Sequence, residues 1–148
     1  MRTRFLPFAA LAFALLNPVL ARADLCVIVH PDNPVLAMTP SQISDLYLGR
    51  ARGFDNNGLT NSARATLYEQ PENSPLREAF FRSINGMSLN HVTAYWARLR
   101  FSGQVLPPEM LADSRAILEK VNTNRNAIGY IESDLVDRSV KVVLRLKQ

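Results

Sequence analysis

The sequence has few residues of the kinds that build metal sites and covalent cross-links. Cys26 is the only cysteine among 148 residues, so no disulfide can form within one chain. The only histidines, His30 and His91, lie far apart, and neither has a Cys/His cluster beside it. Metal sites usually need such clusters, so both histidines are expected to be structural or surface residues. These absences predict a protein without a metal or another cofactor.

The motifs of several enzyme classes are absent as well. The chain contains no G-x-x-x-x-G-K-[ST], G-x-G-x-x-G or G-x-S-x-G sequence, so phosphate-loop, dinucleotide and serine-hydrolase chemistry have no support. Glu69, Glu72 and Glu78 lie close together and offer a general acid and base pair. No nucleophile or substrate pocket is predicted beside them, and Glu72 is suited to stabilising a helix dipole. We therefore expect a protein that is not an enzyme and has no catalytic residues.

Residues 1–23 have the features of a cleavable signal peptide. Arg2 and Arg4 give a basic start, residues 5–16 are mostly apolar, and Ala21-Arg22-Ala23 matches an A-x-A cleavage site. We expect cleavage after Ala23, a mature domain over residues 24–148 and a periplasmic location. An uncleaved N-terminal anchor is the alternative, which Pro18 disfavours.

Long apolar runs are missing from the rest of the sequence, so no membrane span is expected in the mature chain. The net charge of +4 also depends on the first segment. Residues 1–23 hold 3 of the 17 basic residues and no acidic residue, so 14 basic residues remain against 13 acidic ones. The mature net charge of about +1 removes the main support for nucleic-acid binding. The remaining length suits one domain.

The mature sequence alternates between short apolar runs and amphipathic segments. We expect strands over residues 25–30, 65–68, 127–131 and 140–144, with Cys26 buried in the first and Gly129 at a close approach in the third. Helix starts are predicted at Thr39-Pro40, Ser74-Pro75, Ser88, and Asp113 or Ser114. In the third helix Trp96 is expected to be buried, with Arg98 and Arg100 solvated. The order β-α-β-α-α-α-β-β predicts an α/β fold, a central sheet with helices packed on it.

Residues 69–80 connect a predicted strand to a predicted helix, and this is the candidate binding site. The free N–H groups and positive dipole end of such a helix favour an anion. We expect a small anion to bind at residues 73–77, contacting the Ser74 hydroxyl and the N–H groups of Leu76 and Arg77. Asn73 lies in the same turn. The Arg77 side chain adds charge only if it folds back, whereas its first-turn position predicts exposure to solvent. An ordinary capped helix is the alternative.

Three segments carry a resemblance to a known family. They are TPSQISDLYLGR over residues 39–50, SPLREAF over 74–80 and NAIGYIE over 126–132. In this order they resemble segments of periplasmic phosphate-binding proteins, the substrate-binding proteins of phosphate ABC transporters. The resemblance implies a short member of that superfamily, with a single lobe of the type II periplasmic-binding-protein-like fold.

The same resemblance shows what the chain lacks. The family fold holds its ligand between two lobes, whereas this chain has room for about one, and the matching segments belong to the second lobe. Ser74 matches the family's serine at the helix start. Pro75 and Leu76 stand where the family has glycine and threonine, and Gln70 stands where it has arginine. The loss of these donors implies weaker ligand binding.

Two functions therefore remain open. The first is an exported solute-binding-like module that binds phosphate or a similar oxyanion. The second is an envelope protein-interaction module that has lost ligand binding and docks on a transporter or sensor protein through its former cleft face. Ser74 and the helix start favour the first function. Pro75, Leu76, Gln70 and the missing lobe favour the second.

Overall fold

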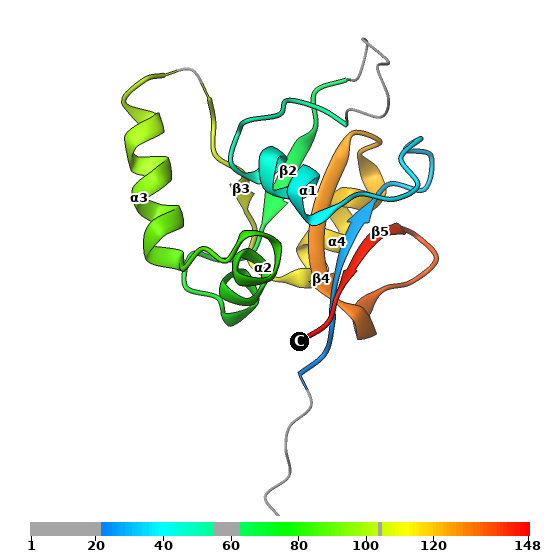
Figure 1. Cartoon of the computed structure of the whole chain (residues 1–148). Coiled ribbons are helices and arrows are strands. Elements are labelled where there is room, and N and C mark those ends of the chain that lie inside the picture. Colours follow the sequence, from blue (N-terminus) through cyan, green and yellow to red (C-terminus); the bar gives the residue numbers. More distant parts are fainter. Residues whose placement is uncertain (1–21, 55–62, 104) are drawn as a thin grey trace, which may run out of the picture.

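A five-stranded mixed sheet forms the centre of the protein. The computed structural model describes residues 22–54, 63–103 and 105–148, so most of the predicted signal peptide lies outside the described residues. The strand order is β3-β2-β4-β1-β5 (Figure 1). The strands are β1 (Leu25–Val29), β2 (Thr66–Glu69), β3 (Glu109–Met110), β4 (Ala127–Glu132) and β5 (Lys141–Leu146). The predicted α/β class with a central sheet is confirmed.

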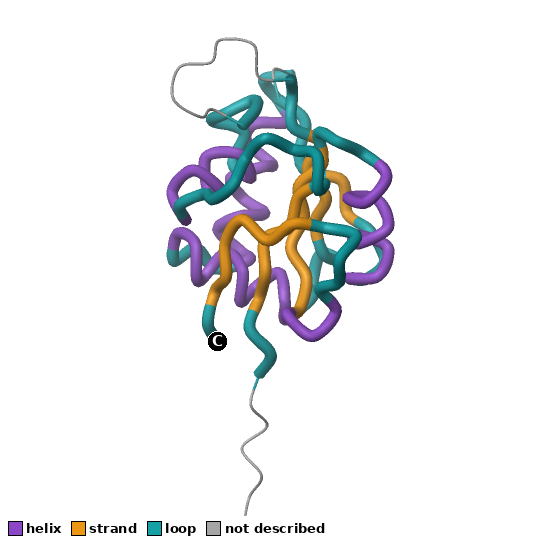
Figure 2. Tube along the Cα trace, turned by 90° about the vertical axis from the view of Figure 1, so that its right-hand side faces the viewer, coloured by secondary structure: helices purple, strands orange, loops and turns teal. Residues whose placement is uncertain are grey.

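Helices cover both faces of this sheet (Figure 2). The helices are α1 (Pro40–Tyr47), α2 (Pro75–Asn85), α3 (Leu89–Arg100) and α4 (Ser114–Thr123), and the short 3-10 helix η1 (Ser133–Leu135) follows β4. Each α-helix begins with a side-chain cap that satisfies one of its free N–H groups. The capping residues are Thr39, Ser74, Ser88 and Asp113, which confirms the predicted starts and decides the last one in favour of Asp113.

Strand β1 is buried on both faces, as its nearly continuous apolar run predicts. It pairs antiparallel with β4 on one side and with β5 on the other. Alternate residues face opposite layers. Leu25, Val27 and Val29 belong to the core beneath α1, α2 and α3. Cys26 and Ile28 belong to the core beneath α4, so the predicted burial of Cys26 is confirmed.

An aromatic cluster fixes α1 and α2 over the ends of β2 and β4. The ring of Phe80 stacks on that of Tyr130, with the centroids 3.7 Å apart and the planes within 3°. The Tyr47 hydroxyl donates to the carbonyl oxygen of Tyr68 at 2.9 Å. A buried tyrosine needs such a partner for its hydroxyl. These contacts join α1 to β2, the strand that leads into the predicted site, and α2 to the neighbouring strand β4.

On the other face, α4 packs directly against β4. A Cβ atom added to Gly129 would lie 2.4 Å from Cγ2 of Ile117, so only glycine allows this approach. The expected close approach at Gly129 is therefore confirmed. Trp96 is buried in α3 with 4% of its surface exposed, and Arg98 and Arg100 are exposed, as predicted.

The structure also contains a strand that the sequence did not predict. The sequence predicts no strand between the third helix and the helix that starts at Asp113 or Ser114. Residues 109–110 instead form β3, which pairs parallel with the end of β2. This pairing places residues 107–113 beside the β2–α2 turn and helps to build the walls of two cavities there.

Candidate functional site

Strand β2 ends between two cavities that share no lining residue. Successive residues of a strand point to opposite sides. Glu69 accordingly lines one cavity and Gln70 lines the other. We call the cavity beside Gln70 the α2–α4 cavity, because the starts of both helices lie in its wall. The cavity beside Glu69 is called the α3 cavity.

The α2–α4 cavity has a volume of about 330 Å³. Its wall is formed by the β2–α2 turn, the start of α4 and the end of β4, and the lining residues are Gln70, Pro71, Ser74, Leu76, Ala112, Asp113, Ser114, Arg115, Glu132 and Leu135. Two helix N-termini thus contribute partial positive charge to one space. This arrangement is suited to a small polar ligand.

Of the predicted site residues, Ser74 and Leu76 lie in the wall of this cavity, whereas Asn73 and Arg77 do not line it. The Ser74 Oγ accepts a hydrogen bond from the Leu76 N–H at 3.2 Å. The hydroxyl hydrogen of Ser74 remains able to donate. Asn73 is exposed in the preceding turn. Among the described residues, no hydrogen bond from the Arg77 backbone N–H is found.

The prediction that the Arg77 side chain points to solvent is wrong. Only 2% of Arg77 is exposed. Its Nε donates to Oε1 of Glu69 at 2.8 Å, its Nη1 donates to the Glu72 carbonyl oxygen at 3.1 Å, and its guanidinium lies over the ring of Phe81. Local helix position could not show this outcome, because the partner comes from the preceding strand. Arg77 lines the α3 cavity and not the α2–α4 cavity, which Ser74 lines.

Burial raises the pKa of Glu69, and the hydrogen bond and charge of Arg77 lower it only in part. The carboxylate is 1% exposed and its partner 3%. Burying such a pair costs both groups their hydration, and their mutual attraction offsets that free energy. The positive charge of Arg77 is therefore matched within the protein and is not free for an anion in the other cavity.

A polar network that the sequence did not reveal forms the floor of the α2–α4 cavity. The Gln70 Nε2 donates to the Ser114 Oγ at 2.7 Å and to the Tyr130 carbonyl oxygen at 3.1 Å. The Ser114 hydroxyl in turn donates to the Glu132 carboxylate. Glu132 is the last residue of β4, which runs parallel to β2. The carboxyl ends of parallel strands lie at the same edge of a sheet. This rule could have placed Glu132 near the end of β2 from the sequence.

The charges in this cavity oppose one another. Asp113 and Glu132 contribute carboxylates, and Arg115 contributes a guanidinium. The Asp113 carboxylate accepts from the Ala116 N–H at 2.9 Å and so is partly engaged in capping α4. The helix starts and Arg115 favour an anion, whereas the two carboxylates disfavour one. These opposed charges leave little net electrostatic attraction for a small anion.

The described residues show no sign of a metal site or a membrane span. No group of three or more His, Cys, Asp or Glu side chains in residues 22–54, 63–103 and 105–148 could hold a metal ion. In the same part of the chain, no helix is long and apolar enough to cross a membrane.

Several solved structures share this fold. A protein from Clostridium perfringens, described as a phosphate ABC transporter substrate-binding protein and solved with bound phosphate, is 28% identical, with a TM-score of 0.66 over 83% of this chain and 45% of its own. An ABC-type phosphate transport receptor from Vibrio cholerae is 23% identical, with a TM-score of 0.64 over 83% of this chain and 46% of its own. PstS from Borrelia burgdorferi is 12% identical, with a TM-score of 0.63 over 83% of this chain and 47% of its own.

The chain thus spans less than half the length of each of these structures. No family model and no curated protein matches the sequence. The likeness is one of fold, and it confirms the prediction of a single lobe of the periplasmic-binding-protein-like architecture.

Proposed function

We propose that this chain is an exported, non-catalytic, solute-binding-like module that binds phosphate or a similar oxyanion at the start of α2. The observation that carries the proposal is the α2–α4 cavity, where two helix N-termini meet in a fold shared with a protein solved with bound phosphate. In this proposal residues 1–23 form a signal peptide cut after Ala23. Residues 24–148 then form a phosphate-binding-like domain in the periplasm.

The proposed contacts come from the β2–α2 turn and the facing helix. The Ser74 hydroxyl and the Arg77 backbone N–H donate to the oxyanion, which lies beside Asn73 and Leu76. Arg115 supplies a cationic side chain from the wall of the same cavity. The Leu76 N–H donates to the oxyanion only when its hydrogen bond to the Ser74 Oγ is broken. Each donor to a charged acceptor is worth about 1.5–3 kcal/mol.

Binding is expected to be weak, with a Kd of about 1 mM or about −4 kcal/mol. Gln70 brings no charge, and its amide is already bonded to Ser114 and Tyr130. The Arg77 guanidinium is paired with Glu69. The carboxylates of Asp113 and Glu132 repel an anion. The described residues form a single lobe, and no second lobe among them excludes water from the ligand.

The second candidate function is a protein-interaction module that docks on an envelope transporter or sensor protein through the same cavity. The specific observation in its favour is that the polar floor of the cavity is satisfied internally, through Gln70, Ser114 and Glu132. A site whose donors are already bonded gains little from a free anion.

A phosphate titration followed by backbone amide NMR tests the first function. We expect shifts in residues 73–77 and 113–115 that saturate at millimolar phosphate and disappear in Ser74→Ala. Ser88→Ala is the matched control, because Ser88 also caps a helix but does not line the cavity. Shifts elsewhere, or none at about 100 mM phosphate, would favour the protein-interaction function.

Export is tested separately by the intact mass of the protein recovered from the cell envelope. The proposal requires a chain that begins at Asp24 in the periplasmic fraction. A chain that retains residues 1–23, or one found in the cytoplasm, would contradict it.

A further inference from the structure

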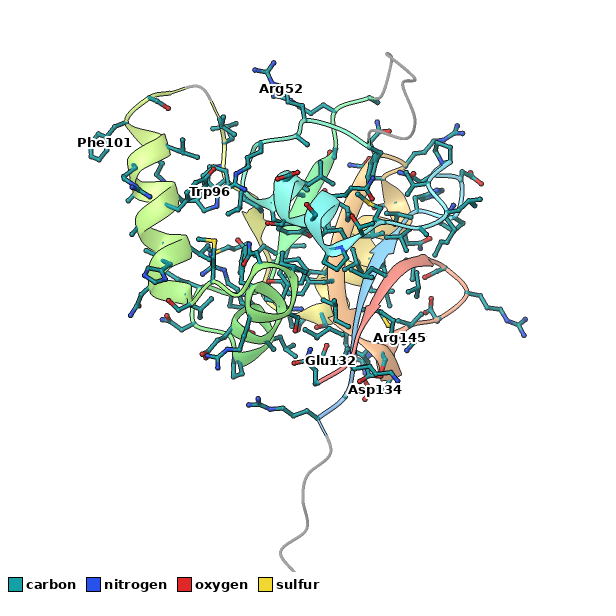
Figure 3. The ribbon with its side chains drawn as sticks, viewed as in Figure 1. Arg52, Trp96, Phe101, Glu132, Asp134 and Arg145 are labelled. Atoms are coloured by element: carbon teal, nitrogen blue, oxygen red, sulfur yellow. The ribbon has the colours of Figure 1, made fainter. Side chains whose placement is uncertain are left out.

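The α3 cavity lies beside the other side of β2 and has a volume of about 100 Å³. Helix α3 and residues 107–110 form its walls, and the lining residues are Glu69, Glu72, Arg77, Thr93, Trp96, Ala97, Arg100, Pro107 and Met110. In Figure 3 the Trp96 side chain points from α3 toward the body of the domain, and Phe101 at the end of α3 points away from it.

Four charged residues line this cavity, and two of them form an ion pair with each other. Glu69 and Arg77 bind each other at 2.8 Å. Arg100 is exposed and forms no ion pair in the part of the chain that the structure describes. Glu72 is exposed too, and among residues 22–54, 63–103 and 105–148 only its backbone carbonyl is engaged, by Arg77. Within these residues, the cavity therefore offers a ligand one cation and one anion that have no ion-pair partner.

Neutral hydrogen-bond donors in this cavity favour a negatively charged ligand over a positively charged one. Trp96 is 4% exposed, and its Nε1 has no hydrogen-bond partner among the described residues. A buried N–H without an acceptor is rare in native proteins and calls for an explanation. Thr93 lines the same cavity. Three residues whose side chains carry hydrogen-bond donors, Thr93, Trp96 and Arg100, thus line one space together with the apolar residues Ala97, Pro107 and Met110.

We propose that the α3 cavity binds a carboxylate group, which accepts hydrogen bonds from Trp96 and Arg100. The cavity is about as large as three water molecules, which suits a carboxylate with one or two methylene groups. Two sources share this chemistry, a free short-chain carboxylic acid and the acidic side chain of a protein segment. Phe101 and Leu106, which adjoin the cavity residues Arg100 and Pro107 in the sequence, are 92% and 83% exposed, and a protein segment that extends beyond the cavity would cover them.

Trp96 is the only tryptophan of the chain, so its fluorescence reports directly on the cavity. We expect acetate, titrated into the purified protein at constant ionic strength, to change the emission with saturation. The neutral isostere acetamide should not. Arg100→Gln should raise the half-saturating acetate concentration about 10- to 100-fold, since a charged hydrogen bond is lost.

Three further variants separate this site from general electrostatics and from the α2–α4 cavity. Arg98→Gln is the matched control, because Arg98 is exposed on the same helix but does not line the cavity. It should leave the acetate titration unchanged. Glu72→Gln removes the opposing charge and should lower the half-saturating concentration. Ser74→Ala should have no effect, so failure of phosphate binding in the other cavity leaves this result intact.

The source of the carboxylate is distinguished with a peptide probe, acetyl-Leu-Asp-Leu-amide. Tighter binding of this peptide than of acetate, lost in a Phe101→Ser/Leu106→Ser variant that still binds acetate, supports a protein segment as the ligand. Equal half-saturating concentrations support a free acid. The proposal is overturned if neither probe gives a saturable change, if acetamide acts like acetate, or if Arg100→Gln binds as the wild type does.

Discussion

The buried ion pair between Glu69 and Arg77 can be tested by replacing Arg77 with methionine. Methionine keeps much of the apolar contact that the arginine makes with Phe81, but it removes both the charge and the bonds to Glu69 and Glu72. The Glu69 carboxylate is then left 1% exposed and without its cationic partner. Leaving one member of a buried pair uncompensated costs about 3–5 kcal/mol.

This cost should depend on pH. Burial raises the pKa of Glu69 even in the presence of Arg77. A carboxyl group with a raised pKa binds more protons in the folded state, so the free energy of unfolding falls as pH rises from the usual carboxyl range through the raised pKa. Without Arg77 this pKa should rise further. The penalty of Arg77→Met should therefore be full at neutral pH and smaller near about pH 4, where Glu69 is protonated.

The assay is urea unfolding from about pH 4 to pH 8, followed by the fluorescence of Trp96. Arg82→Met is the matched control in the same helix, because Arg82 pairs with Glu78 at the surface, with exposures of 69% and 47%. It should cost less than about 0.5 kcal/mol at any pH. A Glu69→Gln/Arg77→Met double variant should recover part of the loss, since no buried charge remains.

A loss below about 1 kcal/mol at pH 7 for Arg77→Met would refute this reasoning, because that value belongs to exposed ion pairs. A loss that stays constant from pH 4 to pH 8 would refute it as well. Either result would mean that the carboxylate finds water or another partner once the arginine is removed.

Three other predictions concern the two cores. Trp96→Ala should lower the free energy of unfolding by about 3–5 kcal/mol in urea melts, and an unchanged melt would show that Trp96 is not a core residue. Gly129→Ala should cost about 1–3 kcal/mol by calorimetry, because its new Cβ would meet Ile117 at 2.4 Å, and wild-type stability would mean that α4 can shift. Cys26 should resist iodoacetamide until the protein unfolds, since burial removes access and raises the pKa of its thiol; rapid labelling of the native protein would contradict this.

Much of the framework was predictable because its signals are local. Thr39, Ser74 and Ser88 cap the helices that they were expected to cap, since capping depends only on residues within one turn. The apolar run of β1 indicated burial on both faces without knowledge of its partners.

The contacts that the sequence did not predict join residues of separate helices and strands. Strand β3 has two residues and forms only because it lies beside β2, some forty positions earlier. Arg77 was placed wrongly because its partner Glu69 is brought to it by the turn between β2 and α2. The contact of Ser114 with Glu132 joins α4 to the far end of β4. Helix periodicity carries no information on any of these contacts.

The central place of β1 has a consequence for the order of assembly. Among the strands in the described part of the chain, β1 is synthesised first, yet it lies between β4 and β5, which follow it by about a hundred residues. Neither edge of β1 can be paired until those late segments have emerged from the ribosome. Contacts of such long sequence separation slow folding. The nascent polypeptide should therefore remain incompletely assembled throughout its synthesis, in a state that a translocation channel can thread and that a holding chaperone would recognise.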